Sequence, residues 1–210
     1  MKETRLYMSM PSHTENQEHH DANLGGSFES HSTTAGRGGR WSTKRISIYA
    51  LFVALTIVLS YVSIPIFPAA PFLKYDPSGI VVLVAGFAFG PLAAAVVGTL
   101  GFVPHIFSNP FGALIAIIVA LALGLPAAFI YKRIRTRKGA VIGILVGSVA
   151  GLAAAILCNV IITPIYAHMS FQQVLGMIIP VLLPFNLMKF AIHGVITFLI
   201  YKPISVLVNH

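Results

Sequence analysis

The fold is decided by residues 79–138, which read GIVVLVAGFAFGPLAAAVVGTLGFVPHIFSNPFGALIAIIVALALGLPAAFIYKRIRTRK. The stretch is apolar almost throughout and ends in a basic cluster at 132–138. One bilayer span needs about 20 helical residues, so 79–131 must hold more than one span. Gly90-Pro91 and Ser108-Asn109-Pro110 are the internal breaks, because proline removes a backbone donor and disfavours helix at the preceding residue.

Three more apolar blocks, at 46–73, 139–167 and 174–201, surround this stretch. Hydrophobic residues make up 56% of the 210-residue chain and charged residues only 10%, and the mean hydropathy is +0.83. These values exclude a soluble enzyme and predict an integral membrane protein. Residues 1–43 are polar and predicted to be a disordered tail, which leaves 44–210 as the membrane domain.

The basic groups determine the number of spans. Lys44-Arg45, the 132–138 cluster and Lys202 flank apolar blocks, and such flanks favour the cytoplasmic side. An even number of spans must then separate the first two groups, so 79–131 contributes three. The result is an all-α membrane protein with six transmembrane helices and both termini cytoplasmic. Because 79–89 is short for a span, we expect a short helix, a tilted one or a segment shielded by its neighbours.

The charge distribution also limits the chemistry. The chain has 14 Lys and Arg residues against 6 Asp and Glu residues, and from Ser30 onward the lone carboxylate is Asp76. Paired carboxylates for acid–base catalysis, metal binding or a proton relay are therefore impossible in the membrane domain. No GxxxxGK[ST] phosphate loop occurs, so ATP is not hydrolysed by that route. The cations follow span ends rather than a soluble face, which argues against nucleic-acid binding. We expect neither an enzyme nor a metal site.

A polar stripe runs along the last apolar block. At about 100° per residue, Asn186, Lys189, His193 and Thr197 fall within roughly 80° of one another, and the other faces are apolar. We expect this stripe to face the interior of the bundle. Lys189 taken alone could instead extend to the headgroups, but that does not explain why Asn186 and His193 share its face.

Two other places in the sequence put polar groups within or beside apolar stretches. Asn159 lies in an apolar run and needs a partner, either another helix or a ligand. The proline-rich loop at 65–78 carries Lys74, Tyr75 and Asp76, and is either a lid over a cavity or a rigid connector. Together with the stripe, these residues predict an outward-opening pocket for a small polar molecule, of the flat heterocyclic kind that amide and ammonium donors suit.

Small residues at four-residue spacing let helices approach closely in lipid. We expect two such sets to pack within the chain, namely Ala116, Ala120, Gly124 and Ala128, and Gly143, Gly147, Gly151 and Ala155. A third pair, Ala50 and Ala54, is equally consistent with internal packing and with a docking face for another subunit.

The motifs now resemble a known family. Four motifs carry the resemblance, namely PFLKYDPS at 71–78, FGP at 89–91, Asn159 with TPIY at 163–166, and PFNLMK at 184–189. They resemble motifs of the substrate-binding (S) subunits of energy-coupling factor (ECF) vitamin transporters. The similarity is greatest to the riboflavin-specific group and covers roughly residues 45–205. After Asp76 the chain departs from that group, with Pro77 and Gly79 where an aromatic residue and a second acid are common.

The resemblance implies six helices around a pocket near the outer face, capped by the first loop. A vitamin, here riboflavin, would be captured from outside the cell membrane. A transmembrane coupling subunit and two ATPase subunits, all separate chains, would drive its uptake with ATP. By the same resemblance, Asn159, Asn186 and Lys189 match the contacts to the isoalloxazine ring, and Ala50 and Ala54 match the docking motif. Lys74, Tyr75 and Asp76 complete the expected substrate-binding set.

Three alternatives stay open at this point. The substrate could be another water-soluble vitamin or precursor, related to pyridoxine or thiamine. The chain could also be a stand-alone facilitator, or a carrier with a histidine relay through His105 and His193. A membrane enzyme is the weakest alternative, because Asp76 is the only acid available.

Overall fold

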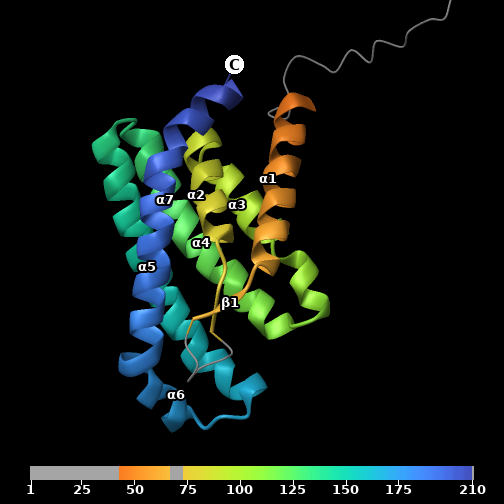
Figure 1. Ribbon diagram of the computed structural model, residues 1–210, viewed down its shortest axis with the longest axis vertical. Coiled ribbons are helices and arrows are strands. Elements are labelled where there is room, and N and C mark those ends of the chain that lie inside the picture. The colour runs from red at the N-terminus through yellow and green to blue at the C-terminus, as the bar shows by residue number, and fades with distance from the viewer. Residues whose placement is uncertain (1–42, 67–72, 210) are drawn as a thin grey trace, which may run out of the picture. The chain divides into compact units, whose positions relative to one another are not determined.

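The computed structural model describes residues 43–66 and 73–209, and this part of the chain is an α-helical bundle (Figure 1). The predicted tail, apart from Thr43, lies outside the described residues, as do residues 67–72 of the predicted lid. The elements in chain order are α1 Thr43–Tyr61, β1 Ile64–Pro65, β2 Lys74–Tyr75, α2 Ser78–Phe89, α3 Pro91–Leu100, η1 Val103–Phe107, α4 Pro110–Arg133, α5 Arg137–Ala167, α6 Phe171–Met177, η2 Ile178–Leu182 and α7 Leu183–Asn209.

Six apolar helical segments occur where the sequence predicts spans. Four are long and apolar enough to cross a bilayer, namely α1, α4, α5 and the α6–η2–α7 segment up to Ile204. The other two are shorter, α2 and the α3–η1 segment Pro91–Phe107. The break between them is built by Gly90, whose φ of 91° suits glycine, and by Pro91 at the first turn of α3.

The shortness of α2 is tolerated because its neighbours shield it. Every residue from Ser78 to Phe87 is buried, and α1, α3, α4 and α7 all contact the helix. A Cβ atom on Gly86 would lie 3.0 Å from the Cβ of Ala128 and 3.1 Å from that of Ala94. Of the alternatives expected for 79–89, the structure shows a short helix that its neighbours shield. That the next segment is also short, with only ten residues in α3, was not expected.

The small-residue sets pack inside the bundle as predicted. A Cβ atom on Gly143 would lie 2.8 Å from the Ala127 carbonyl oxygen, and one on Gly147 only 2.3 Å from that of Leu123. The backbones of α4 and α5 therefore touch along this line. On another side of α4, a Cβ atom on Gly124 would lie 2.8 Å from Val82 of α2.

One end of the bundle collects the basic groups. The start of α1, the turn between α4 and α5 and the end of α7 lie at the same end (Figure 1). Lys44-Arg45, the 132–138 cluster and Lys202 belong to these three places. At the opposite end, β1 and β2 pair antiparallel, with Ile64 opposite Tyr75 and Pro65 opposite Lys74. This short ladder leads into α2 and positions Lys74–Asp76 at the hairpin end of the interior helices.

Candidate functional site

A cavity of about 200 Å³ lies inside the bundle at the hairpin end, between α2, α4, α5 and α7. Five of the six side chains predicted to bind substrate line it, and these are Lys74, Asp76, Asn159, Asn186 and Lys189. The remaining wall is mostly apolar and includes the aromatic rings of Phe102, Phe185 and Phe190. Residues from four separate segments thus converge on one chamber.

The predicted stripe of α7 faces this interior. Asn186, His193 and Thr197 are buried, at 5%, 1% and 0% exposure. Lys189 is turned the same way, and its ammonium lies 2.7 Å from the Asp76 carboxylate. It therefore does not extend to the headgroups, and the inward orientation of the stripe is confirmed.

Asp76 is held on three sides. Its carboxylate accepts hydrogen bonds from the ammonium of Lys189, from the hydroxyl of Ser78 and from the Ser78 backbone N–H at 3.2 Å. Burial favours the neutral acid, but the charge of Lys189 and these hydrogen bonds outweigh it and hold the pKa of Asp76 below its usual value. The carboxylate is therefore ionised at neutral pH, and its charge balances that of Lys189.

His193 connects the same loop to α7 through the backbone. Its Nε2 lies 2.9 Å from the Asp76 carbonyl oxygen, and a carbonyl only accepts, so Nε2 carries a proton. Nδ1 then has no hydrogen-bond partner among the described residues. It lies over Gly79, where a Cβ atom would approach it to 2.5 Å. Glycine at position 79 thus makes room for this imidazole.

The two asparagines keep hydrogen-bonding capacity for a ligand. Asn159 donates to the Ala155 carbonyl and Asn186 to the Leu182 carbonyl, both at 2.8 Å. The Asn159 bond stays within α5, and the Asn186 bond reaches back to the last residue of η2, which continues directly into α7. Each bond uses one of the two amide hydrogens. Thr163 donates to the Asn159 oxygen at 3.0 Å and fixes that amide. In the described part of the chain, neither amide bonds to a helix packed beside its own, so the interhelical role considered for Asn159 is not seen.

A second, larger hollow of about 670 Å³ adjoins the chamber. Both are lined by Lys74, Asp76, Asn109 and Tyr166. We call the inner space the chamber and the larger one the vestibule.

His105 forms part of the vestibule wall. It stacks on Tyr61 with ring centres 4.3 Å apart, and its Nε2 lies 2.7 Å from the Ser60 hydroxyl. Its ring thus links η1 to the end of α1.

Tyr75 is the predicted site residue that lies elsewhere. It does not line the chamber or the vestibule. Its buried ring belongs to an apolar cluster with Leu73 and Leu182 and lies 5.6 Å from the ring of His193. Successive side chains of an extended strand point to opposite sides, so Lys74 and Asp76 face the cavity while Tyr75 faces away. Tyr75 supports the site from behind.

Several lining residues were not singled out from the sequence as ligand contacts. Asn109 was interpreted only as part of a helix break, and its side chain indeed caps α4 by accepting from Gly112 N at 2.9 Å. It also lines both chamber and vestibule. Ser78 and Phe102 also line the chamber. Ser78 lies in the PFLKYDPS motif but is given no role of its own there, and nothing local distinguishes Phe102 from the other residues of its apolar run.

Ala50 and Ala54 lie far from this chemistry. Both are exposed on α1, beside the large exposed side chains of Leu51, Leu55 and Val58. Neither alanine is buried in the described bundle. This leaves the face they share available for a partner.

Comparison with known proteins gives a consistent result. The family model described as "ECF transporter, substrate-specific component" matches residues 44–204. "Riboflavin transporter RibU" of Streptococcus thermophilus is 30% identical over 188 residues, covering 80% of this chain and 86% of the relative. "Riboflavin transporter RibU" of Staphylococcus aureus is 28% identical over 172 residues, covering 77% and 90%. "Riboflavin transporter FmnP" of Bacillus subtilis is 27% identical, covering 75% and 90%.

Solved structures share the fold. One, titled "Structure and mechanism of the S component of a bacterial ECF transporter", superposes with a TM-score of 0.68 at 23% identity, covering 80% of this chain and 98% of the other. Another, of ThiT from Listeria monocytogenes, gives 0.57 at 19% identity, covering 76% and 96%. The family model covers residues 44–204, from the start of α1 into α7, and it describes a transporter component rather than an enzyme. The chain belongs to the substrate-specific (S) components of ECF transporters.

Proposed function

We propose that this S component binds riboflavin from the outer side of the cell membrane and presents it for ATP-driven uptake. The observation that carries the proposal is the convergence of Lys74, Asp76, Asn159, Asn186 and Lys189 on one chamber. The names of the three relatives, all riboflavin transporters, support the choice of vitamin.

The chemistry of the chamber suits the isoalloxazine ring. The ring is flat and largely apolar, and its polar edge carries carbonyls and ring nitrogens. Aromatic walls such as Phe185 and Phe190 can bury its faces. The free amide hydrogens of Asn159 and Asn186 and the ammonium of Lys189 can donate to its edge. A small number of fixed polar groups in an apolar wall is the usual form of a small-molecule site.

The size of the two cavities suggests how the ligand lies. The chamber alone, at about 200 Å³, is below the roughly 300 Å³ at which ligand pockets usually begin. The vestibule adds space on the hairpin side, and its walls carry polar groups such as Ser60, Lys74 and Asn109. We place the ring in the chamber and the hydroxylated ribityl chain toward the vestibule, within reach of Lys74 and Asn109.

Calorimetric titration of the purified protein with riboflavin tests this function. We expect saturable binding at micromolar ligand, and weaker binding for Asn159→Leu and Asn186→Leu, which keep the volume but remove the donors. Gln172→Leu, on the exposed surface of α6, is the control and should bind as the wild type does. Absence of heat with riboflavin, but binding of thiamine or pyridoxine, would instead identify another vitamin as the substrate.

Energy would come from partner subunits. An ECF coupling subunit would dock on the α1 face that carries Ala50 and Ala54, and two ATPase subunits on separate chains would hydrolyse the ATP. The shared basic end of the bundle supports a cytoplasmic position for both termini. Vesicles containing the chain alone should not accumulate riboflavin, whereas vesicles with the ATPase module and ATP should. Uptake by the chain alone would favour a stand-alone facilitator.

A further inference from the structure

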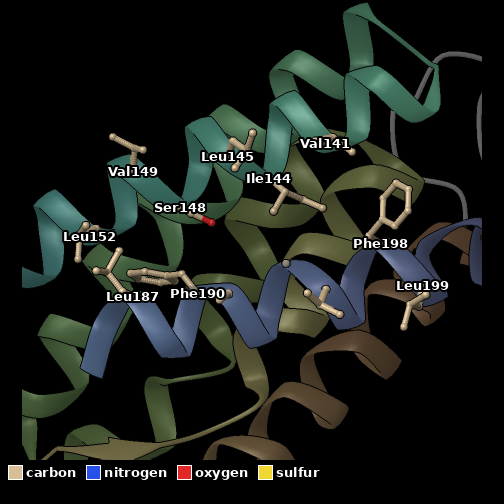
Figure 2. A pocket seen from close by; sticks show the side chains of 13 residues that line it. Val141, Ile144, Leu145, Ser148, Val149, Leu152, Leu187, Phe190, Phe198 and Leu199 are labelled. Atoms are coloured by element: carbon tan, nitrogen blue, oxygen red, sulfur yellow. The ribbon is translucent and has the colours of Figure 1, made fainter. Parts of the chain in front are cut away.

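An apolar groove of about 500 Å³ runs along the surface of the bundle between α5 and α7, as Figure 2 shows. Side chains from Val141 to Leu152 on α5 face those from Leu187 to Leu199 on α7 across it. Ser148 supplies the one polar side chain among the lining residues. The groove is separate from the chamber, although Phe190 lines both.

The groove has the length of one membrane leaflet. From Val141 to Leu152 the rise along α5 is about 16 Å, at about 1.5 Å per residue. The hydrocarbon core of a bilayer is about 30 Å thick, so half of it is about 15 Å. An acyl chain of one leaflet therefore fits along the groove, parallel to the helices.

Two cations stand at one end of the groove. A smaller hollow adjoins it there, sharing Val141 and Phe198 and lined also by Arg137 and Lys138. Both cations are exposed, and neither has a carboxylate partner among the described residues. The described carboxylate, Asp76, pairs with Lys189 at the other end of the bundle. Among the described residues, Arg137 and Lys138 thus remain available to an anion.

We propose that this groove and its two cations bind one anionic phospholipid. An acyl chain would lie between α5 and α7, and the phosphodiester would contact Arg137 and Lys138. Guanidinium and ammonium groups are good donors to phosphate oxygens, and an apolar groove with a basic end matches a molecule that has an apolar tail and an acidic head. The lipid site does not depend on which vitamin occupies the chamber.

Native mass spectrometry tests the proposal. The full chain, purified in mild detergent, is incubated with an equimolar mixture of phosphatidylglycerol and phosphatidylcholine with matched acyl chains. We expect a retained adduct of one phosphatidylglycerol per protein, in clear excess over phosphatidylcholine. Equal retention of the two lipids, or no retention of either, would overturn the proposal.

Variants locate the site. The double variant Arg137→Gln with Lys138→Gln should reduce the preference for phosphatidylglycerol by about fivefold for each cation removed. The matched control is Arg133→Gln with Arg135→Gln, which removes the same charge from the same end but outside the groove and its adjoining hollow. An equal loss in the control would reduce the effect to general surface charge and refute the site.

A second pair of variants tests whether the acyl chain of the lipid binds in the groove. Ala191→Phe fills the groove and should abolish the retained adduct, whereas Ala153→Phe, exposed on α5 outside the groove, should not. Unchanged thermal unfolding and riboflavin titration of each variant establish that it is folded. Retention by Ala191→Phe at the wild-type level would exclude the groove as the binding site.

Discussion

The ammonium of Lys189 lies 2.7 Å from the carboxylate of Asp76, although 113 residues separate them in the chain. This ion pair joins the outer loop to the last helix at the wall of the chamber. Both side chains are largely but not wholly enclosed, at 18% and 17% exposure. A ligand in the chamber can therefore reach either group while the pair remains intact.

Replacing Lys189 with methionine should weaken riboflavin binding by about 1–3 kcal/mol, the scale of losing a charged hydrogen-bond donor in a buried site. The change also leaves the Asp76 carboxylate without its counter-ion. Calorimetric titration measures the effect, with Lys202→Met at the opposite end of α7 as the control. An unchanged affinity for Lys189→Met would mean that the ammonium serves the loop and not the ligand.

The ion pair also predicts how stability depends on pH. Although burial alone would raise it, the pKa of Asp76 is held below its usual value by Lys189 and Ser78. A group with a lowered native pKa contributes stability above its unfolded pKa of about 3.9, and the contribution is lost as pH falls through the native value. The difference in unfolding temperature between the wild type and Asp76→Asn should therefore stay constant from about pH 7 to about pH 5 and shrink below about pH 4. A difference that already vanishes near neutrality would contradict the assigned shift.

Gly79→Ala should destabilise the protein, because the added Cβ atom would approach His193 Nδ1 to 2.5 Å. Both groups are buried, so the imidazole or the start of α2 must shift, at a cost of about 1–3 kcal/mol. Thermal unfolding in detergent measures this. Gly176→Ala is the matched control, because no atom of the described residues lies within 4 Å of its added Cβ atom.

A second substitution separates the steric effect from the glycine's backbone contribution. Combining Gly79→Ala with His193→Ala removes the ring that the new methyl group would meet. The double variant should lose less stability than the sum of the two single variants. Simple additivity would mean that His193 is not the obstacle.

Local periodicity explains why the stripe on α7 could be predicted. Asn186, Lys189, His193 and Thr197 share a face by helix geometry alone, and lipid on the other side leaves the interior as the place for polar groups. The ion pair with Asp76 could not be derived in this way, because it depends on which segments are neighbours. The sequence nevertheless carried a signal. Asp76 is the lone acid of the membrane domain and Lys189 lies within a span, and because both are costly to bury unpaired, they are natural partners.

Other features could not be predicted correctly from the sequence, each for a different reason. Tyr75 was grouped with Lys74 and Asp76 as a site residue, but the alternation of an extended segment turns it to the apolar cluster behind them. The shortness of α3 could not be predicted, because 91–107 is apolar over a length that suits a span. The need for glycine at position 79 depends on a ring from α7, which no local pattern reveals.

The exposed alanines of α1 should affect assembly and not ligand binding. Replacing Ala50 or Ala54 with tryptophan should leave riboflavin affinity unchanged, since neither lines the chamber or the vestibule. The same change should impair assembly with the coupling and ATPase subunits, because small residues allow another helix to approach closely. Co-purification of the full transporter and titration of the isolated chain measure the two properties separately. Ala153→Trp, exposed on α5, is the control, and assembly that survives at both α1 positions would place the docking surface elsewhere.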